Sequence, residues 1–479
     1  MNPLPPGLDA ALGRPIYLEK ILNSSIQNIL DGDTDSTWCP SEKKRSQTIK
    51  IDLGSDRRIT GLAITWASAA TFNSSFEVLK GSSWVALQTQ SGSVQASETR
   101  VSSVDASARY VRLNLSGNKK LPCIAALRVF AKPLAQTPPM LIGHDLSTLI
   151  QLEDVGKQFS EAGVVAPAEQ ILKRYNGNLV RLRLWVDPEE NFNNLAQVKR
   201  MALRIKAAGM KFLLDLHYSD TWADPGHQEI PKAWLGQDLT SLAQSVKAYT
   251  QSVLEELSAQ NTLPDMVQVG NEITNGMLYP IGKINDSSDA GFKDFATLLN
   301  AGIEGVHAAT PAGQKLEIMI HIDRGSNAFL TQSFFERLEK AQVQYDVIGL
   351  SYYPYWNGSL SSLRGSLDAL AKRFKKPIVI AETAYPHTLE DSDHYPNVIG
   401  AGAALPTAYP PTPAGQGLFL RDLMSIVART PNQLGRGIIY WESAWIPGIG
   451  WKPGEGNAWD NQAMFDQNGV ALESLNALR

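Results

Sequence analysis

Two apolar stretches, NLVRLRLWV at residues 178–186 and KFLLDLHYS at residues 211–219, decide the fold of this chain. Each has the length of a β-strand, and the segment between them is long enough for a helix and contains several Ala, Leu and Lys residues. A strand, a helix and a second apolar strand form the unit from which buried parallel sheets are built. The two stretches therefore predict an α/β domain.

The same pattern occurs eight times in the second part of the chain. The expected strands are residues 140–145, 178–186, 211–219, 265–272, 315–323, 345–354, 377–385 and 437–445. Eight parallel strands that alternate with helices close into a barrel, for which about 340 residues suffice even with long loops. We therefore expect a (β/α)₈ TIM barrel over residues 140–479.

The first part of the chain has a different pattern. Residues 17–133 contain short alternations of apolar and polar residues, such as TIKIDL at 48–53 and YVRLNL at 110–115, separated by Gly, Ser, Asn and Asp. This alternation is typical of an all-β sandwich. Residues 134–139 (LAQTPP) contain prolines without apolar periodicity, which indicates a linker.

The composition excludes some classes of protein. The 44 Lys and Arg residues and 48 Asp and Glu residues give a net charge of −4, without the basic patch that a nucleic-acid partner requires. No stretch approaches the roughly 18 apolar residues of a membrane span, so we expect no membrane partner. The first residues, MNPLPPGLDA, lack the basic start and apolar core of a signal peptide. We expect a monomer in the secreted or cell-envelope compartment, with any signal already removed.

Polar and aromatic side chains end most of the expected barrel strands. In a barrel the carboxyl ends of all strands meet on one face, where active sites lie. The strand-end residues are His144, Asp145, Arg181, Arg183, Asp215, His217, Asn271, Glu272, His321, Asp323, Tyr352, Tyr353, Glu382, Trp441 and Glu442.

Glu272 and Glu382 stand out because each ends an otherwise apolar strand, in QVGNE and VIAET. A single glutamate there is explained as well by a buried ion pair with Arg181 or Arg183. Two of them, on the fourth and seventh strands, favour glycoside hydrolysis, in which one carboxyl group protonates the leaving oxygen and the other attacks the sugar or activates water. Asn271, which precedes Glu272, could then bind the sugar 2-hydroxyl.

Seven stretches of the barrel resemble glycoside hydrolase family 53, the arabinogalactan endo-β-1,4-galactanases of clan A. They are NLVRLRLWVDP, GMKFLLDLHYSDTWADPG, VQVGNEITNG, IMIHID, IGLSYYPYW, VIAETAYP and YWESAW, and the resemblance covers about residues 140–475. It implies retaining double displacement, with Glu272 as acid/base and Glu382 as nucleophile. It also implies that Arg181 lies beside the nucleophile and that Tyr353 or Tyr352 donates to it.

The resemblance implies that β-1,4-galactan and galacto-oligosaccharides are the substrates and that no cofactor is required for the chemistry. One alternative is another clan A endo-glycanase, such as a mannanase or glucanase, because the clan shares both glutamates. A second is a non-catalytic glycan-binding protein, which would tolerate the loss of either carboxylate.

Further residues are expected around the sugar. His217 and His321 either contact sugar hydroxyls or hydrogen-bond behind them, and Asp145 either supports the sugar at the cleavage point or fixes an arginine. Trp441 is expected to form the apolar floor there, because the C–H faces of a pyranose pack on indole. Trp222, on a loop after the third strand, is a further expected platform, although core packing also explains many loop tryptophans.

The loop between the seventh and eighth strands contains EDSDHYPN at residues 390–397. Some members of the family hold calcium with an aspartate-rich segment here and a later aspartate. By that matching Asp391, Asp393, Asn397 and Asp460 are candidate ligands, and oxygen ligands suit calcium. A solvated acidic loop is the alternative.

Residues 17–133 resemble the discoidin-like, coagulation factor 5/8 type C domain, the fold of family 32 carbohydrate-binding modules. The similarity lies in NILDGDTDSTW, TIKIDLG, ITGLAITW, FEVLKGSSWVAL, ARYVRLNL and IAALRVFA. It implies an all-β jelly-roll sandwich. Trp38, Trp66 and Phe72 are candidates for stacking on a galactose-type sugar, with a place in the core as the alternative for Trp66. A purely structural spacer is the alternative role of the domain.

Two features of this module remain open in the sequence. A calcium loop of the family falls on Asp31, Asp33 and Thr37, but this chain has Ala126 where a glutamate usually completes the site. The two cysteines, Cys39 and Cys123, are able to form one disulfide, but the sequence does not give their separation.

Overall fold

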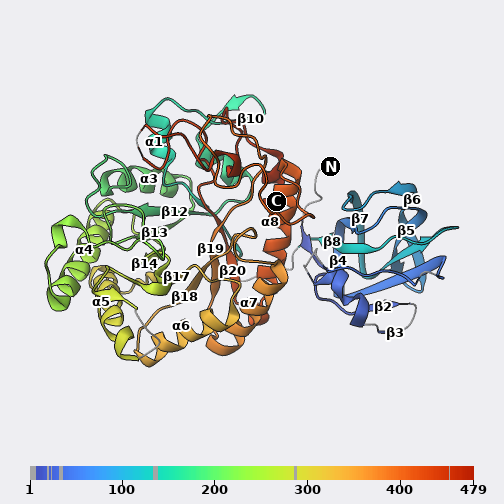
Figure 1. The fold of residues 1–479 in the computed structure, drawn as a ribbon, viewed down its shortest axis with the longest axis horizontal. Helices are drawn as coiled ribbons and strands as arrows, with labels where there is room; N and C mark the ends of the chain where they lie inside the picture. The colour runs from blue at the N-terminus through green and yellow to red at the C-terminus, as the bar shows by residue number, and fades with distance from the viewer. Residues whose placement is uncertain are drawn as a thin grey trace.

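The computed structural model of the protein describes residues 7–18, 21–22, 24–31, 36–41, 43–132, 139–284, 289–452 and 454–479. Figure 1 shows two parts side by side, an α/β barrel and a smaller all-β domain, with helix α8 (Pro413–Ala428) on the side of the barrel that faces the all-β domain. Residues 134–138 of the expected linker lie outside the described residues. No described helix combines the length and the apolar character that a membrane-spanning helix needs.

The barrel is closed by eight parallel strands in the order β12, β13, β14, β17, β18, β19, β20 and β9. Their bounds are β9 Leu141–Asp145, β12 Leu179–Leu184, β13 Lys211–Leu216, β14 Met266–Val269, β17 Glu317–Ile322, β18 Val347–Ser351, β19 Ile378–Thr383 and β20 Gly435–Tyr440. The (β/α)₈ fold is therefore confirmed. Each expected strand is present, although several end earlier than their apolar stretches.

The strands are apolar along their length because both of their faces are buried. One set of side chains forms a core of its own: Leu141, Leu179, Leu213, Met266, Met319, Val347, Val379, Ala381 and Ile439. Residues that alternate with these, such as Val180 and Leu182, belong to the larger core between the strands and the helices. Two buried faces leave little room for polar residues before the strand ends.

Eight α-helices accompany these strands in the described part of the chain. They are α1 Leu149–Asp154, α2 Ala168–Arg174, α3 Leu195–Ala207, α4 Leu239–Ala259, α5 Asp289–Ala309, α6 Ala328–Lys340, α7 Leu360–Phe374 and α8 Pro413–Ala428. Five begin at a residue whose side chain accepts a hydrogen bond from a backbone N–H of the first turn, the usual helix N-cap. These residues are Asn194, Asp238, Asn327, Ser359 and Thr412.

Short elements lie in the barrel loops. The paired strands are β10 Ser160–Glu161 with β11 Val164–Val165, and β15 Gly276–Met277 with β16 Gly282–Lys283. The 3₁₀ helices of the barrel are η2 Lys232–Trp234, η3 Ile273–Asn275, η4 Pro431–Gln433, η5 Asp460–Gln462 and η6 Glu473–Leu478. Of these, η3 directly follows Glu272 and η5 begins at Asp460, so both belong to the face that carries the strand ends.

The all-β domain contains antiparallel strands in the order β1, β8, β4, β7, β5 and β6, with β2 and β3 beside β4. Their bounds are β1 Leu8–Asp9, β2 Ile16–Leu18, β3 Ile21–Leu22, β4 Ser46–Trp66, β5 Ala70–Lys80, β6 Ser83–Val94, β7 Thr99–Ser116 and β8 Ile124–Ala131, and the 3₁₀ helix η1 spans Ser24–Leu30. The all-β prediction is therefore confirmed. The sheet also includes β1, which lies before residue 17.

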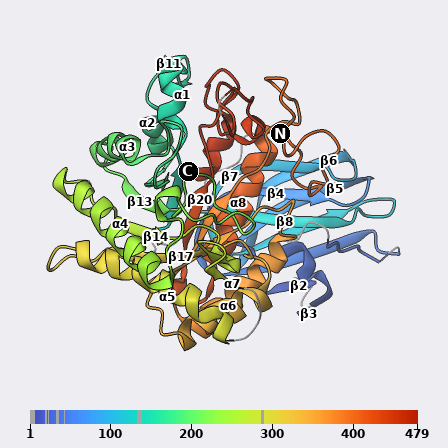
Figure 2. The same ribbon diagram turned by 60° about the vertical axis from the view of Figure 1, so that its left-hand side comes forward.

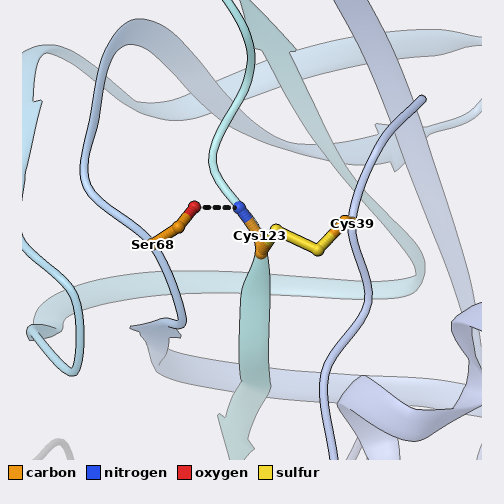
Figure 3. Close-up of a disulfide and its surroundings, with 3 residues drawn as sticks. All are labelled: Cys39, Ser68 and Cys123. Atoms are coloured by element: carbon orange, nitrogen blue, oxygen red, sulfur yellow. Dashed lines mark hydrogen bonds between the residues drawn. A yellow bond between two sulfur atoms is a disulfide. The ribbon is translucent and has the colours of Figure 1, made fainter. Parts of the chain in front are cut away.

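Cys39 and Cys123 form a disulfide, the pairing that the sequence left open. Their Cα atoms are 4.2 Å apart, and the bond joins the segment before β4 to the residue that precedes β8. Figure 3 shows that the backbone N–H of Cys123 also donates to Ser68 Oγ, at 2.8 Å. The disulfide therefore ties together segments that are 84 residues apart.

The all-β domain packs against helix α8 through β1 and β8, and Figures 1 and 2 both show β8 on the side of the domain next to this helix. Arg128 of β8 forms a buried ion pair with Asp422 of α8 at 2.6 Å. The Asp9 N–H of β1 donates to Ser425 Oγ at 2.8 Å, and Arg429 donates to the Ala10 carbonyl at 2.7 Å. The barrel covers α8 on one side and the all-β domain covers it on the other. All of its residues from 415 to 427 are therefore buried.

Candidate active site

A cleft of about 750 Å³ lies at the carboxyl ends of the barrel strands. Its lining comes from strand ends and from the loops that follow them: Arg181, Arg183, His217, Thr221, Trp222, Ala223, Asp224, His227, Glu229, Asn271, Glu272, Asp323, Ser351, Tyr353, Trp356, Asn357, Glu382, Trp441, Trp451, Lys452 and Trp459. Both glutamates singled out in the sequence therefore face one cavity.

Glu382, near the end of β19, is held by two donors. Arg181 lies 3.0 Å from its Oε1, and the Tyr353 hydroxyl donates to its Oε2 at 3.0 Å. The side chain is buried, with 6% of its surface exposed. A carboxylate with an ion pair at one oxygen and a hydrogen bond at the other is held in one orientation, as an attacking group must be.

Arg181 of β12 is the centre of the charge network. Besides Glu382, it binds Asp145 Oδ2 at 2.8 Å and Asp215 Oδ2 at 2.8 Å, and it donates to Asn271 Oδ1 at 2.8 Å. Its guanidinium is almost fully buried, and the neighbouring carboxylates raise its pKa despite that burial. Arg181 therefore stays charged and orients residues from four different strand ends.

Glu272 lies three residues beyond the last residue of β14 and has a left-handed backbone conformation, with φ 48° and ψ 45°. Such a conformation is unusual for a residue with a Cβ and occurs often at functional sites. Gly270, two residues before Glu272, has φ 84°, and a Cβ at this position would lie 2.7 Å from the Ile273 side chain. Glu272 Oε1 lies 2.6 Å from Ser351 Oγ, within hydrogen-bond distance.

The surroundings of the two glutamates separate their proton affinities. Burial raises the pKa of Glu272 well above its ordinary value, and the negative charges of Glu382 and Asp323 raise it further. Burial also raises the pKa of Glu382, to about 7, but Arg181 and the Tyr353 hydrogen bond oppose the increase. Glu382 therefore loses its proton first, and Glu272 retains its own.

The structure distinguishes between the two tyrosines that the sequence left as alternatives. Tyr353 donates to Glu382, whereas the Tyr352 hydroxyl donates to the Gly358 carbonyl at 2.8 Å. Tyr352 is fully buried and is not part of the cleft lining, so its expected role in substrate binding is wrong. Both tyrosines lie directly after β18, and their hydroxyl groups reach different partners.

The other expected polar residues divide into two groups. His217 lines the cleft, with Nε2 3.0 Å from Asp215 and Nδ1 accepting from Trp185 Nε1 at 3.1 Å. Asp145 and His321 are fully buried behind the lining. Asp145 fixes Arg181, one of its two expected roles, and His321 hydrogen-bonds to residues that line the cleft instead of reaching sugar.

Aromatic rings form one wall of the cleft. Trp222 and Trp441 both line it, with ring centroids 6.2 Å apart, and Trp441 is stacked with Trp451 at 5.8 Å. Trp356 also lines the cleft and is 56% exposed. Trp445, a further loop tryptophan, is fully buried beneath Trp222 and belongs to the core.

Among the residues of the site that the sequence prediction misses, four have clear contacts with the predicted ones. Trp451 and Trp459 come from the loop after β20, where GWKPGEGNAWD has two tryptophans within nine residues, a density that could have indicated them. Gln268 is fully buried inside β14, and its amide hydrogen-bonds to Arg181, Asp215 and Asn271. Ser351 ends β18 in LSYY, where only the two tyrosines were predicted to belong to the site.

The acidic loop 390–397 lies next to Asp460, as the expected calcium site requires, but its oxygens are mostly used by the protein. Asp393 accepts from the backbone of Tyr395 and Asn457, and Ser392 hydrogen-bonds to Asp460. Asp460 Oδ1 and Asn397 Oδ1 are buried and have no hydrogen-bond partner. Among the described residues, no group of three or more His, Cys, Asp or Glu side chains is arranged to hold a metal.

In the all-β domain the expected stacking residues are core residues. Trp38, Trp66 and Phe72 are all buried, and the Trp66 and Phe72 rings contact each other edge to face at 4.8 Å. The expectation of a sugar-binding surface is therefore wrong for Trp38 and Phe72, which are buried, whereas Trp66 has its alternative place in the core. Of the expected calcium loop, Asp33 lies outside the described residues.

Comparisons with known proteins agree with this geometry. Residues 141–478 match the family model described as Glycosyl hydrolase family 53, and residues 22–127 match that of the F5/8 type C domain. The arabinogalactan endo-beta-1,4-galactanase of Cellvibrio japonicus is 37% identical over 343 residues, which cover 70% of this chain and 88% of that protein.

Two solved structures are also similar to the barrel. The Ignisphaera aggregans GH53 catalytic domain aligns with a TM-score of 0.68 at 38% identity, covering 72% of this chain and 97% of that one. A fungal beta-1,4-galactanase aligns with a TM-score of 0.62 at 32% identity, covering 70% of this chain and 98% of that one.

Proposed function

The chain belongs to glycosyl hydrolase family 53, and we propose that it is a retaining endo-β-1,4-galactanase that cleaves the galactan side chains of pectic, type I arabinogalactan. One observation carries the proposal: Glu272 and Glu382 line one cleft, and only Glu382 is held by a buried arginine. The two carboxyl groups thus have the unequal environments that an acid and a nucleophile require.

In the first half of the reaction Glu382 attacks the anomeric carbon while Glu272 protonates the departing glycosidic oxygen. Arg181 and Tyr353 keep the Glu382 carboxylate ionised and aimed into the cleft. The product of this half is a galactosyl ester of Glu382, with the configuration at the anomeric carbon inverted once.

In the second half Glu272, now a carboxylate, takes a proton from a water molecule that attacks the same carbon. The ester bond to Glu382 breaks, and the second inversion restores the β configuration. Glu272 ends this half protonated again, as its buried position favours. No cofactor is needed for either half.

The substrate is proposed from the wall of rings and from the relatives. Trp222, Trp441, Trp451 and Trp459 present several indoles to the cleft, which suits a chain of sugar units. The endo-galactanase name of the Cellvibrio japonicus relative favours galactan over the mannan or glucan of other clan A enzymes. Retention of both glutamates in a formed cleft disfavours a non-catalytic glycan-binding protein.

The proposal extends to a structural calcium ion between the 390–397 loop and Asp460. The buried Asp460 Oδ1 and Asn397 Oδ1, both without partners, are hard oxygen atoms of the kind that calcium takes. The ion would tie the loop to η5 and take no part in the reaction. Added calcium should then raise the melting temperature of EDTA-treated protein, and Asp460→Asn should abolish that increase. An unchanged melting temperature would leave the loop a solvated acidic segment.

We also propose that the protein acts as a monomer outside the cytoplasm or at the cell envelope. A polysaccharide of this size is met outside the cell, and the Cys39–Cys123 disulfide persists best in an oxidising compartment. Light scattering of the purified protein measures the oligomeric state directly.

A comparison of polysaccharides tests the proposed function. Purified protein is incubated with β-1,4-galactan, β-mannan and a soluble β-glucan, and the products are sized while proton NMR follows the anomeric signals. We expect short galacto-oligosaccharides with the β anomer formed first. Preferred cleavage of mannan or glucan would assign another clan A activity, and binding without cleavage would assign a glycan-binding role.

A further inference from the structure

Ser351, the last residue of β18, contacts the acid/base directly. Its hydroxyl oxygen lies 2.6 Å from Glu272 Oε1, and the side chain lines the cleft although only 1% of its surface is exposed. The contact joins the end of the sixth barrel strand to the end of the fourth. It therefore holds one oxygen of Glu272 at a fixed place.

His321 lies behind Ser351 and is fully buried. Its Nε2 is 2.9 Å from Ser351 Oγ, and its Nδ1 is 2.9 Å from Asn271 Oδ1. Burial lowers the pKa of His321 well below its ordinary value, and the charge of Arg181 lowers it further. The imidazole is therefore neutral and carries one hydrogen, on one of these two nitrogens.

The amide of Asn271 determines which nitrogen carries that hydrogen. Asn271 Nδ2 donates to the Ala223 carbonyl at 2.8 Å, so Oδ1 is the atom that faces Arg181 and His321. Gln268 Nε2 also lies 3.1 Å from His321 Nδ1, but its two hydrogens are directed to the closer oxygens, Asp215 Oδ1 at 2.5 Å and Asn271 Oδ1 at 2.9 Å. The hydrogen that Asn271 Oδ1 accepts from the imidazole is therefore on His321 Nδ1. The Nε2 lone pair then faces Ser351, and Ser351 donates to it in the free enzyme.

We propose that Ser351 is the positioning residue of the acid/base Glu272 and that His321 directs the Ser351 hydroxyl; this inference rests on the proposed galactanase function. A hydroxyl group both donates and accepts. In the free enzyme it accepts from a protonated Glu272 Oε1 and donates to His321. When a glycosidic oxygen enters, the proton lies on Oε2 and the hydroxyl turns to donate to Oε1.

The same contact serves both halves of the reaction. As the glycosidic bond breaks and the bond from Glu382 to the anomeric carbon forms, Oε2 gives its proton to the leaving oxygen and Ser351 donates to the carboxylate. When water attacks, it gives one proton to Oε2 and the ester bond breaks. Ser351 keeps its own hydrogen throughout, and only the direction of the hydrogen bond changes.

The test compares leaving groups in the Ser351→Ala variant. Cleavage of a phenyl β-1,4-galactobioside depends on protonation of the leaving phenol by Glu272. Cleavage of the 2,4-dinitrophenyl compound does not, because dinitrophenolate leaves without a proton. We expect kcat/KM for the phenyl substrate to fall by about 10- to 100-fold, which is less than the roughly 100- to 10,000-fold contribution of general acid catalysis because Glu272 itself remains. We expect kcat/KM for the dinitrophenyl substrate to change by less than about threefold.

Two further variants make the result decisive. Ser443→Ala is the matched control, because Ser443 is also buried and also hydrogen-bonds to a histidine, His144, at 2.8 Å. It should change kcat/KM for both substrates by the same factor. Ser351→Cys fills the same space with a weak hydrogen-bonding group and replaces the alanine variant if that variant does not fold.

An equal fall for both substrates, or no fall for either, would overturn the positioning role of Ser351. Failure of the proposed function is a separate outcome, seen in the unmodified protein. A wild type that cleaves neither galactan nor the galactobiosides would contradict the galactanase assignment before any variant is compared.

Discussion

At the scale of single residues, two glutamates of one cleft differ in their pKa values. Glu382 is buried and Glu272 is half-buried, and removal from water raises the pKa of each, but only Glu382 has a buried cation beside it. The charge that Arg181 stabilises on Glu382 is in turn one of the causes that raise the pKa of Glu272. The acid and the nucleophile are therefore assigned by their neighbours rather than by residue type, and their titrations are coupled.

Glu382→Gln tests this coupling. The substitution removes the nearby negative charge, so the pKa of Glu272 should fall, as measured by carboxyl ¹³C NMR of the free enzyme. It should not return to its ordinary value, because burial is the larger cause. Turnover of galactan should fall by several powers of ten, since the nucleophile is lost. An unmoved Glu272 titration would mean that burial alone keeps the acid protonated.

Tyr353→Phe removes one of the two donors of Glu382. The Tyr353 hydrogen bond lowers the pKa of that glutamate, so its loss should raise the pKa and move the acid limb of the kcat/KM profile to higher pH. A hydrogen bond to a charged group is worth about 1.5–3 kcal/mol, which corresponds to about a 10- to 100-fold loss of kcat/KM.

Tyr352→Phe is the matched control for Tyr353→Phe, because the neighbouring hydroxyl donates to the Gly358 carbonyl instead. It should lower stability and leave the pH profile in place. If both variants shift the acid limb equally, the assignment of Tyr353 to the nucleophile is wrong.

The sequence predicted the charged residues of the site better than the residues that position them. Glu272, Glu382 and Arg181 are costly to bury, so their places at the ends of apolar strands indicated a use. Ser351 and Gln268 are ordinary residues in a strand, and only the arrangement of neighbouring strands shows what they touch. The choice between Tyr352 and Tyr353 likewise could not be made from strand alternation, because both lie beyond the last residue of β18.

At the scale of elements, the barrel was predictable because all eight strands are buried on both faces and read as apolar runs. The all-β domain was predictable as a class, but not in its exposed residues. Trp66 lies in an alternating strand, and nothing in that alternation shows which set of side chains faces inward. The packing of β1 and β8 on helix α8 is a contact between parts distant in the sequence, and no local pattern indicates it.

This contact between elements has a pH dependence that can be measured. Asp9 of β1 is fully buried, and its Oδ1 accepts from the backbone N–H groups of Ala11 and Val129, at 2.9 Å each. Burial raises its pKa from 3.8 to about 6, and the charge of Asp422 raises it further. The folded protein therefore prefers protonated Asp9. The stability from this preference is complete below about pH 3.8 and is lost as the pH rises through about 6.

Asp9→Asn should therefore stabilise the protein above about pH 6, by up to about 3 kcal/mol, because asparagine keeps the acceptor oxygen without the charge. Urea unfolding at pH 4 and pH 7.5 measures the difference from the wild type at each pH. The gain should be largest at pH 7.5 and small at pH 4. A gain that is the same at both values would show that Asp9 is not the titrating group of this contact.

At the scale of the whole molecule, the barrel supplies the chemistry and the all-β domain is fixed to its side. The buried Arg128–Asp422 pair and the hydrogen bonds from Asp9 to Ser425 and from Arg429 to the Ala10 carbonyl make that attachment specific. The cleft lies at the ends of the barrel strands, and each of its residues belongs to the barrel part of the chain. The activity is therefore a property of residues 140–479, and the central claim about it is that Glu382 forms a covalent bond to the sugar.

Covalent trapping tests that claim most directly. The protein is incubated with the 2-deoxy-2-fluoro analogue of 2,4-dinitrophenyl β-1,4-galactobioside, which slows hydrolysis of the intermediate more than its formation. Mass spectrometry of the intact protein and of its peptides then locates the adduct. We predict one fluorogalactobiosyl group per chain, attached to Glu382 and absent in Glu382→Gln. An adduct on Glu272, or substrate turnover that yields the α anomer without any adduct, would contradict the account.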